Sequence, residues 1–264
     1  MSVQTATRIP GRSAARLPDR EVTVDGSRML TREWRGDGVD APTVVLVHGL
    51  VVAGDFVVPT AARLGDRYRV LAPDLPGYGR STAAGDEVSV VGLGAALGSW
   101  ADAVGLTSAV FVGNSFGTQV VTELALRRPR LAERLVLAAP TMDPTARSLP
   151  ETLRRWQRES QTQSRALKRL LVRQYARAGI RRSARTVAAA LRDRPEDRLP
   201  HLAAPSLVLR GTADPIVTAG WAQEVARLLP HGRLQVLPDV PHAMAFDAPD
   251  ALPEAVRRFL EEDR

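Results

Sequence analysis

A serine whose sequence context could make it a nucleophile occupies position 115. Ser115 lies in Gly113-Asn-Ser-Phe-Gly117, directly after the apolar run 109–112 and before the helical stretch 118–127. On so sharp a connection between a strand and a helix, a serine projects its hydroxyl into open space, and small flanking residues let neighbouring backbone pass closely. A serine hydroxyl needs a base to attack at neutral pH. The pattern therefore predicts a nucleophile at Ser115 and a base nearby.

His242 is the first candidate for that base among the four histidines of the chain. It follows the expected strand 234–237 in a loop, and an imidazole with a pKa near ~6.5 can take up a proton near neutral pH. His48 ends an expected strand, whereas His201 and His231 lie in proline-containing loops where exposed side chains are usual. We therefore expect His242 to be the general base.

Asp214 is the first candidate for the acid that orients the imidazole and stabilises its charged form. It comes just beyond the expected strand 206–209, so its loop should open at the same edge of the sheet as Ser115 and His242. Asp143, which follows the preceding strand, is the alternative acid.

Short β-branched apolar runs alternate with helical stretches, as a mostly parallel sheet with crossover helices requires. The expected strands of this sheet are 43–47, 68–72, 109–112, 134–138, 206–209 and 234–237. Ahead of them, 21–24 and 29–34 flank Asp25-Gly26 and are typical of an antiparallel hairpin at a sheet edge. The interval 144–200 has helical periodicity and prolines at both ends, which predicts a helical cap laid over the sheet.

Composition narrows the class of protein. The chain has 264 residues, 44% of them hydrophobic and 25% charged, which allows one large α/β domain. It has no cysteine, which excludes thiol nucleophiles, disulfides and thiolate metal ligands. We expect a flexible arm over 1–20, a core over 21–143 and 201–264, and the cap over 144–200. Residues 1–20 lack the apolar stretch of a secretory signal. The absence of cysteine fits a cytoplasmic address, and because the sequence has no metal, nucleotide or flavin motif we expect no cofactor and no metal.

The charge of the chain is concentrated in the expected cap. The net charge is +7, but Lys168 is the only lysine among 36 basic residues, which indicates a compositional bias toward arginine. We therefore expect a small-molecule substrate and no nucleic-acid or membrane partner, with monomer and homodimer both open. The cap holds 14 arginines and Lys168 against five acidic residues. If Arg173 faced Ser115, it would favour an anionic substrate, although arginines at helical spacing more often form a solvated face.

From about Glu21 to Leu260 the chain resembles the α/β-hydrolase fold family. The order serine, aspartate, histidine is the one that this family uses. His48-Gly49-Leu50 after a strand is similar to the family's oxyanion motif, and residues 74–81 are similar to the segment after its next strand. The resemblance implies a mostly parallel eight-stranded sheet with helices on both faces and a cap inserted after the sixth strand.

The same resemblance implies how the site would work. The oxyanion would be held by the backbone N–H groups of Leu50 and Phe116, and His48 would be structural. Preorganised donors of this kind contribute roughly several kcal/mol of transition-state stabilisation. The implied activity is hydrolysis of a small ester, lactone or thioester through an acyl-enzyme on Ser115. Val51, Arg173 and Met244 are the expected substrate-pocket residues.

Other activities on the same fold stay open. Gly-Asn-Ser-Phe-Gly also resembles the elbow of carbon–carbon bond hydrolases of the meta-cleavage type. Those enzymes resemble one another in a tryptophan after the base, where this chain has Ala243, and in a glycine-rich oxyanion stretch, where it has residues 50–52. A low-turnover ligand receptor and a cofactor-free perhydrolase would need the same triad. Epoxide hydrolases and haloalkane dehalogenases are disfavoured, because they use an aspartate where Ser115 stands.

Overall fold

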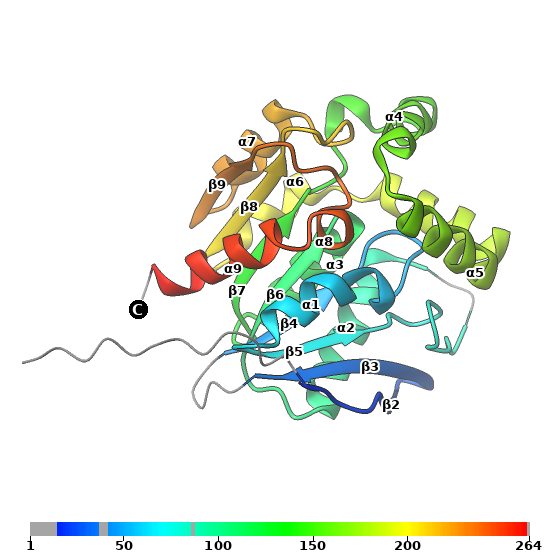
Figure 1. Ribbon diagram of the computed structural model, residues 1–264, viewed down its shortest axis with the longest axis vertical. Helices are drawn as coiled ribbons and strands as arrows, with labels where there is room; N and C mark the ends of the chain where they lie inside the picture. Colours follow the sequence, from blue (N-terminus) through cyan, green and yellow to red (C-terminus); the bar gives the residue numbers. More distant parts are fainter. Residues whose placement is uncertain (1–14, 37–41, 86–87, 263–264) are drawn as a thin grey trace, which may run out of the picture.

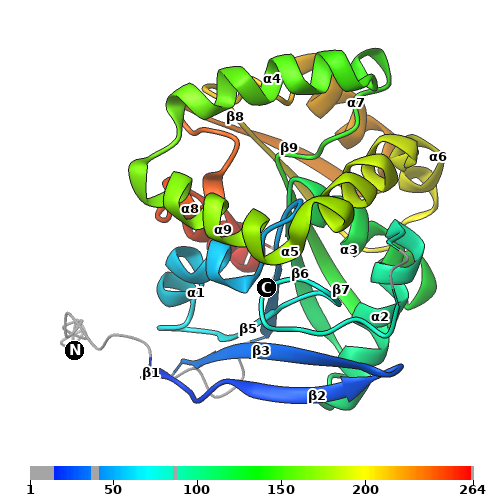
Figure 2. The same ribbon diagram turned by 90° about the vertical axis from the view of Figure 1, so that its right-hand side faces the viewer.

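A twisted sheet with helices on both faces makes up the part of the chain that the computed structural model describes, residues 15–36, 42–85 and 88–262 (Figures 1 and 2). Within these residues nine strands are joined in the order β1-β3-β5-β4-β6-β7-β8-β9, with β2 also paired to β3. The pairs among β4 to β9 are parallel, and the pairs that β3 makes are antiparallel. The strands are β1 (Ala15–Arg16), β2 (Arg20–Val24), β3 (Ser27–Arg35), β4 (Thr43–Val47), β5 (Arg69–Pro73), β6 (Ala109–Asn114), β7 (Ala132–Ala138), β8 (Ser206–Gly211) and β9 (Gly232–Leu237).

The expected strands and the hairpin are confirmed. Each expected parallel strand has its counterpart from β4 to β9, with bounds that differ by at most two residues. Both faces of these strands are covered by helices, so their residues can be continuously apolar. In the hairpin of β2 and β3, Asp25 and Gly26 have φ angles of 47° and 73°, the left-handed pair that a tight two-residue turn needs.

Helices α1, α8 and α9 cover one face of the sheet, and α2 and α3 cover the other (Figure 2). Serine or threonine caps α2, α4, α5 and α7, since the side-chain oxygen accepts a free backbone N–H of the first turn. The α-helices are α1 (Val58–Leu64), α2 (Val90–Ala103), α3 (Phe116–Arg127), α4 (Leu149–Thr162), α5 (Arg165–Arg192), α6 (Pro195–Arg198), α7 (Ala219–Leu228), α8 (Met244–Asp247) and α9 (Ala251–Glu261). The short 3-10 helices are η1 (Gly54–Val57), η2 (Pro144–Ala146) and η3 (Leu199–His201).

The long interval between β7 and β8 is helical, as its periodicity predicts. It contains η2, α4, α5, α6 and η3, and α4 and α5 lie across one end of the sheet (Figures 1 and 2). Gly179, with φ 75° and ψ 161°, divides α5 into two helical segments. The cap therefore covers the sheet end where the expected site residues follow their strands.

The expected arm differs from the structure at its C-terminal end. Ala15 and Arg16 pair with Trp34 and Arg35 of β3, so a ninth, two-residue strand adds to the eight that were expected. β2 begins at Arg20, one residue before the expected core boundary. The rest of the expected arm, residues 1–14, lies outside the described residues. Over the described part of the chain, no helix is both long and apolar enough to cross a membrane.

Candidate active site

Ser115 lies at the sharp turn that joins β6 to α3, which we call the elbow. Its backbone has φ 57° and ψ −121°, a left-handed conformation that a serine adopts only where its surroundings enforce it. The flanking glycines make the turn possible. A Cβ on Gly113 would lie 2.5 Å from the backbone of Gly117, and one on Gly117 would lie 2.8 Å from the carbonyl oxygen of His48. The close passage of backbone that the sequence pattern implied is therefore present.

Ser115, His242 and Asp214 form a chain of two hydrogen bonds. Nε2 of His242 lies 2.9 Å from Oγ of Ser115, and Nδ1 lies 2.9 Å from Oδ2 of Asp214. A carboxylate only accepts, so Nδ1 donates to Asp214 and Nε2 accepts the serine proton. The other carboxylate oxygen accepts the backbone N–H groups of Ile216 (2.7 Å) and Val217 (3.0 Å). The arrangement can carry a proton from Ser115 to the imidazole.

The environment of the pair keeps Asp214 ionised and makes His242 a stronger base. Burial by itself raises the pKa of Asp214, but the nearby His242 and the two backbone N–H groups lower that pKa overall. Burial by itself lowers the pKa of His242, but the charge and hydrogen bond of Asp214, with a contribution from Glu159, raise it overall. The imidazolium that forms when Ser115 loses its proton is therefore stabilised.

Asp143, the alternative acid, makes other contacts. Its Oδ1 accepts from the backbone N–H of Thr145 at 2.9 Å and from the hydroxyl of the same residue at 2.7 Å. Its Oδ2 accepts from Oγ1 of Thr218 at 3.0 Å, which ties η2 to the start of α7. Asp143 thus caps a helix in the structure, while Asp214 contacts the histidine.

The two expected oxyanion residues border the same cavity as Ser115. Leu50 follows the β4 strand and Phe116 begins α3, and both line the cavity that contains Ser115 and His242. Gly49 packs against the elbow, since a Cβ there would lie 3.3 Å from the carbonyl oxygen of Asn114 and 3.5 Å from Cβ of Ser115.

His48 is buried, and its ring supports the loop that contains Gly49 and Leu50. Its Nε2 accepts the backbone N–H of Leu75 at 3.0 Å, and Nδ1 donates to the carbonyl of Gly49 at 3.0 Å. Burial lowers the pKa of His48, which keeps the ring neutral. This contact pattern fits the structural role that the resemblance implied.

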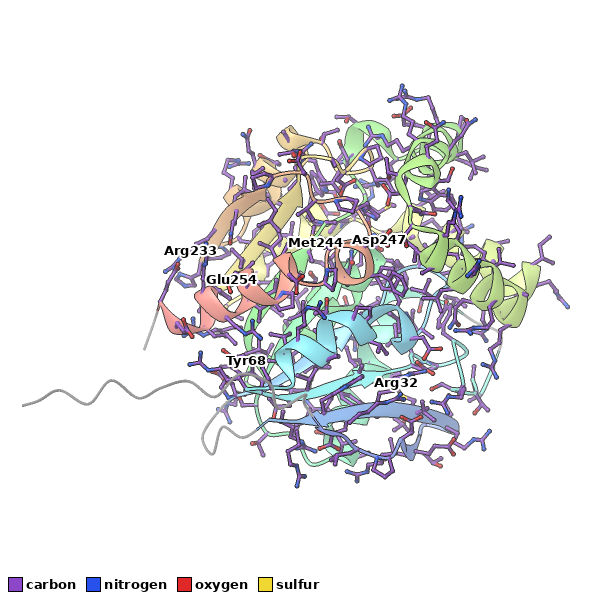
Figure 3. The ribbon with its side chains drawn as sticks, viewed as in Figure 1. Arg32, Tyr68, Arg233, Met244, Asp247 and Glu254 are labelled. Atoms are coloured by element: carbon purple, nitrogen blue, oxygen red, sulfur yellow. The ribbon has the colours of Figure 1, made fainter. Side chains whose placement is uncertain are left out.

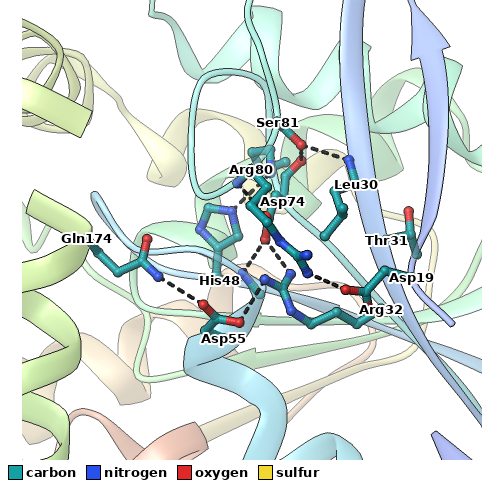
Figure 4. A network of polar contacts seen from close by, with 12 residues as sticks. Asp19, Leu30, Thr31, Arg32, His48, Asp55, Asp74, Arg80, Ser81 and Gln174 are labelled. Atoms are coloured by element: carbon teal, nitrogen blue, oxygen red, sulfur yellow. Dashed lines mark hydrogen bonds and ion pairs between the residues drawn. The ribbon is translucent and has the colours of Figure 1, made fainter. Parts of the chain in front are cut away.

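A buried ion pair holds the neighbouring loop in place (Figure 4). The Arg32 guanidinium contacts Asp74 at 2.6 Å and Asp55 at 2.7 Å, and Asp74 also accepts the backbone N–H of Gly54 at 2.7 Å. Gln174 of α5 donates to Asp55 at 3.3 Å. The network therefore connects β3, the loop after β5 and the cap.

The cavity over Ser115 has a volume of about 300 Å³ and lies between the sheet and the cap. Its walls are mostly apolar, which suits the hydrocarbon part of a small substrate. Side chains from the core and from the cap both contribute, among them Phe56, Trp156, Leu167, Leu171 and Trp221. The described residues contain no group of three or more histidine, aspartate or glutamate side chains that could hold a metal ion.

Comparison with known proteins places the chain in a family. Residues 44–255 match the profile of the family described as "Alpha/beta hydrolase family". The chain belongs to this family. The pimeloyl-[acyl-carrier protein] methyl ester esterase of Pectobacterium carotovorum is 27% identical to this alpha/beta hydrolase, over 88% of this chain and 100% of the esterase. The (E)-2-((N-methylformamido)methylene)succinate hydrolase of Acinetobacter baylyi is 24% identical, over 90% of this chain and 97% of the relative.

The fold of this alpha/beta hydrolase is shared by solved structures. A thermophilic esterase from Thermogutta terrifontis superposes with a TM-score of 0.76 at 21% sequence identity, over 93% of this chain and 99% of the esterase. The expected fold class is thereby confirmed, and the chain is a hydrolase by family.

Three expected pocket residues of this alpha/beta hydrolase do not line the cavity in the described part of the chain. Val51 has φ 56° and is buried. Met244 is fully buried at the start of α8 (Figure 3). The Arg173 side chain is 67% exposed and lies 3.8 Å from Asp55. The helical face of α5 that carries Arg173 is thus the solvated one, and the expectation was wrong for all three.

Two polar residues of the site were not predicted from the sequence. Asn114, next to the nucleophile, donates to the carbonyl oxygens of Ala138 and His242 at 3.4 Å each and accepts the backbone N–H of Ala245 at 3.3 Å. It therefore ties the elbow to the histidine loop. The second is Glu159 of α4, which lies on the same helical face as Trp156. That spacing was a signal in the sequence, but only the fold shows that the face points toward Ser115.

Proposed function

We propose that this protein cleaves a small ester, lactone or thioester by nucleophilic catalysis at Ser115. The observation that carries the proposal is the continuous hydrogen-bonded chain from Ser115 through His242 to Asp214, opening on an apolar cavity. Curated relatives named as an ester hydrolase and as a succinate-derivative hydrolase support this class of reaction.

The proposed reaction uses Ser115, His242 and Asp214 in turn. His242 Nε2 takes the proton of Ser115 as Oγ attacks the substrate carbonyl, and Asp214 stabilises the imidazolium. The backbone N–H groups of Phe116 and Leu50 would bind the oxyanion of the tetrahedral intermediate. His242 then donates its proton to the leaving alcohol or thiol, which leaves an acyl-enzyme on Ser115. Water activated by the same histidine attacks the acyl carbonyl, and the proton taken up returns to Oγ of Ser115.

The test is removal of the nucleophile. In Ser115→Ala, hydrolysis of p-nitrophenyl esters should fall by about 10³-fold or more, because no covalent intermediate can form. A phosphonate probe should label wild-type protein at Ser115 alone, as mapped by peptide mass spectrometry. Ser108→Ala, which removes an exposed hydroxyl bonded to Glu133, is the matched control and should keep wild-type activity. A label on another serine, or activity retained in Ser115→Ala, would reassign the nucleophile.

Substrate panels separate ester cleavage from the alternatives on the same fold. We expect turnover of p-nitrophenyl esters to exceed turnover of 2-hydroxy-6-oxodienoates, the substrates of carbon–carbon bond hydrolases of the meta-cleavage type. Faster cleavage of the dienoate would favour that alternative. Binding of both without turnover would favour a ligand receptor, and peroxyacid formation from acetate and hydrogen peroxide would favour a perhydrolase.

A further inference from the structure

Glu159 is a buried carboxyl group in the wall of the cavity, contributed by the cap helix α4. The residue is only 3% exposed, and it lines the same cavity as Ser115 and His242. No atom of the described residues lies in full hydrogen-bond geometry with Oε1 or Oε2, although the backbone N–H of Ala243 is near enough to lower the pKa of the carboxyl group. Leaving a buried polar group without a partner costs free energy, so such a group calls for an explanation in the function of the site.

The other charged side chains of the cavity wall already have partners. Arg155, one turn before Glu159, contacts Glu151 at 2.7 Å and donates to the carbonyl of Ile216 at 2.6 Å. Asp143 accepts from two threonines. Arg155 is therefore held by Glu151, which it shares with Arg154, and no ion pair joins Arg155 to Glu159 in the described part of the chain.

We propose that Glu159 forms a subsite for an ammonium group of the substrate, so that the preferred substrates are amine-bearing esters, lactones or thioesters. This inference rests on the proposed function, because it identifies a feature of the substrate that Ser115 would attack. An ammonium group supplies the hydrogen-bond donors that both carboxylate oxygens lack, and its charge is opposite to that of Glu159.

The charges around Glu159 favour a cation. Burial raises the pKa of Glu159, the negative charges of Asp214 and Asp247 raise it further, and His242 and the backbone N–H of Ala243 lower it. Asp143 and Arg155, which pairs with Glu151, are the other charged groups of the cavity wall. A bound ammonium group would stabilise the ionised carboxylate and so oppose the effect of burial. A substrate carboxylate would instead face several acidic groups, while Arg173 lies outside the cavity.

The experiment compares esters that differ only in one terminal group. Three pairs replace a methyl group by an ammonium group: p-nitrophenyl heptanoate and 6-aminohexanoate, p-nitrophenyl isobutyrate and alaninate, and heptyl and 6-aminohexyl acetate. The readout is the ratio of kcat/KM for the ammonium substrate to kcat/KM for its methyl partner. The p-nitrophenyl monoester of adipate, which carries a terminal carboxylate, is included as the anionic substrate. Glu159→Gln removes the charge at nearly constant shape, and comparing ratios between variants cancels the intrinsic reactivity of each ester.

At least one pair should show a ratio that falls by about tenfold or more in Glu159→Gln, the size expected when a desolvated charge pair loses one partner. For the 6-aminohexanoate and 6-aminohexyl pairs, whose ammonium groups have a pKa near ~10, the ratio should rise with pH in wild-type protein as Glu159 ionises and should stay flat in the variant. Glu254→Gln on α9, which removes an exposed carboxylate paired with Arg258, is the control and should keep the wild-type ratio (Figure 3). Unchanged ratios in all three pairs, or a preference for the adipate monoester, would overturn the proposal.

Failure of this inference is distinguishable from failure of the proposed function. If the methyl esters are cleaved but the ammonium group brings no advantage, only the subsite is excluded. If no ester is cleaved, the proposed function fails and the subsite is measured by binding. In that case Ser115→Ala should be stabilised against heat by ethyl 6-aminohexanoate more than by ethyl heptanoate, and this difference should vanish in Ser115→Ala/Glu159→Gln. Equal stabilisation by the two esters would exclude the subsite.

Discussion

At the scale of single residues, hydrogen-bond partners separate the two aspartates that could serve as the acid. Asp214 contacts the imidazole of His242 and has its second oxygen filled by two backbone N–H groups. The carboxylate oxygens of Asp143 accept hydrogen bonds from Thr145 and Thr218 instead. Both residues follow neighbouring strands, and the sequence ranked Asp214 first but left Asp143 open as the alternative.

The aspartate pair gives a prediction. Asp214→Asn should lower kcat for an activated ester by about 10²- to 10⁴-fold, because an amide can hold the imidazole in the wrong tautomer and cannot stabilise its charge. Asp143→Asn should change kcat by less than about threefold, since an amide oxygen can still accept from threonine. Steady-state kinetics on the two purified variants measures this, with circular dichroism as the check on folding. The reverse ranking would assign the acid to Asp143.

The pH dependence of the rate follows from the environment of His242. Asp214 and Glu159 raise the pKa of His242 despite its burial, and the base works only when neutral. A raised pKa means that activity is lost at a higher pH on acidification, so the acid limb of kcat/KM for a neutral ester should have its midpoint above ~6.5. Glu159→Gln removes one negative charge and should move that midpoint to lower pH. A wild-type midpoint below this value, or one that Glu159→Gln raises, would contradict the assignment.

At the scale of elements, the strand β6, the elbow and the helix α3 depend on close backbone contact. The conformation of Ser115 is held because β4 passes directly beneath α3, with Gly117 at the contact. His242 reaches Ser115 because the loop after β9 is tied back to Asn114 of the elbow. The hydrogen bonds between the loop after β9 and Asn114 therefore help to set the distance between His242 and Ser115.

Adding one methyl group at Gly117 should show that the elbow depends on close backbone contact. A Cβ at Gly117 would fall well inside van der Waals contact with the carbonyl oxygen of Val47 and within 2.8 Å of that of His48, and backbone cannot move aside easily. Gly117→Ala should therefore lower the free energy of unfolding by about 2 to 4 kcal/mol, measured by urea denaturation. Gly220→Ala in α7, where no described atom beyond the chain neighbours and the helix's own backbone lies within 4 Å of the added Cβ, should raise it by up to ~1 kcal/mol. Equal effects of the two substitutions would show that the elbow has room to relax.

At the scale of the whole molecule, the cap separates charge between its two sides. Exposed arginines of α4 and α5 pair with acidic neighbours at the surface, as Arg154 does with Glu151 and Arg173 with Asp55. The inner side of the cap presents apolar groups, Glu159 and the Glu151-paired Arg155 to the cavity. The cap lies over one end of the sheet (Figure 1), so the same helices that carry most of the positive charge contribute a negative group to the site. Net charge of the cap is therefore a poor guide to the charge of its substrate.

The sequence by itself determined the sheet, the cap and the positions of Ser115, His242 and Asp214 at strand ends, because alternation of apolar runs and tight-turn residues are local properties. The tertiary structure decided which of the two candidate aspartates contacts His242, since this depends on loops that pack together from distant parts of the chain. It also decided the pocket. Arg173 and Glu159 both lie on amphipathic cap helices, and only the rotation of each helix against the sheet turns Arg173 to solvent and Glu159 toward Ser115.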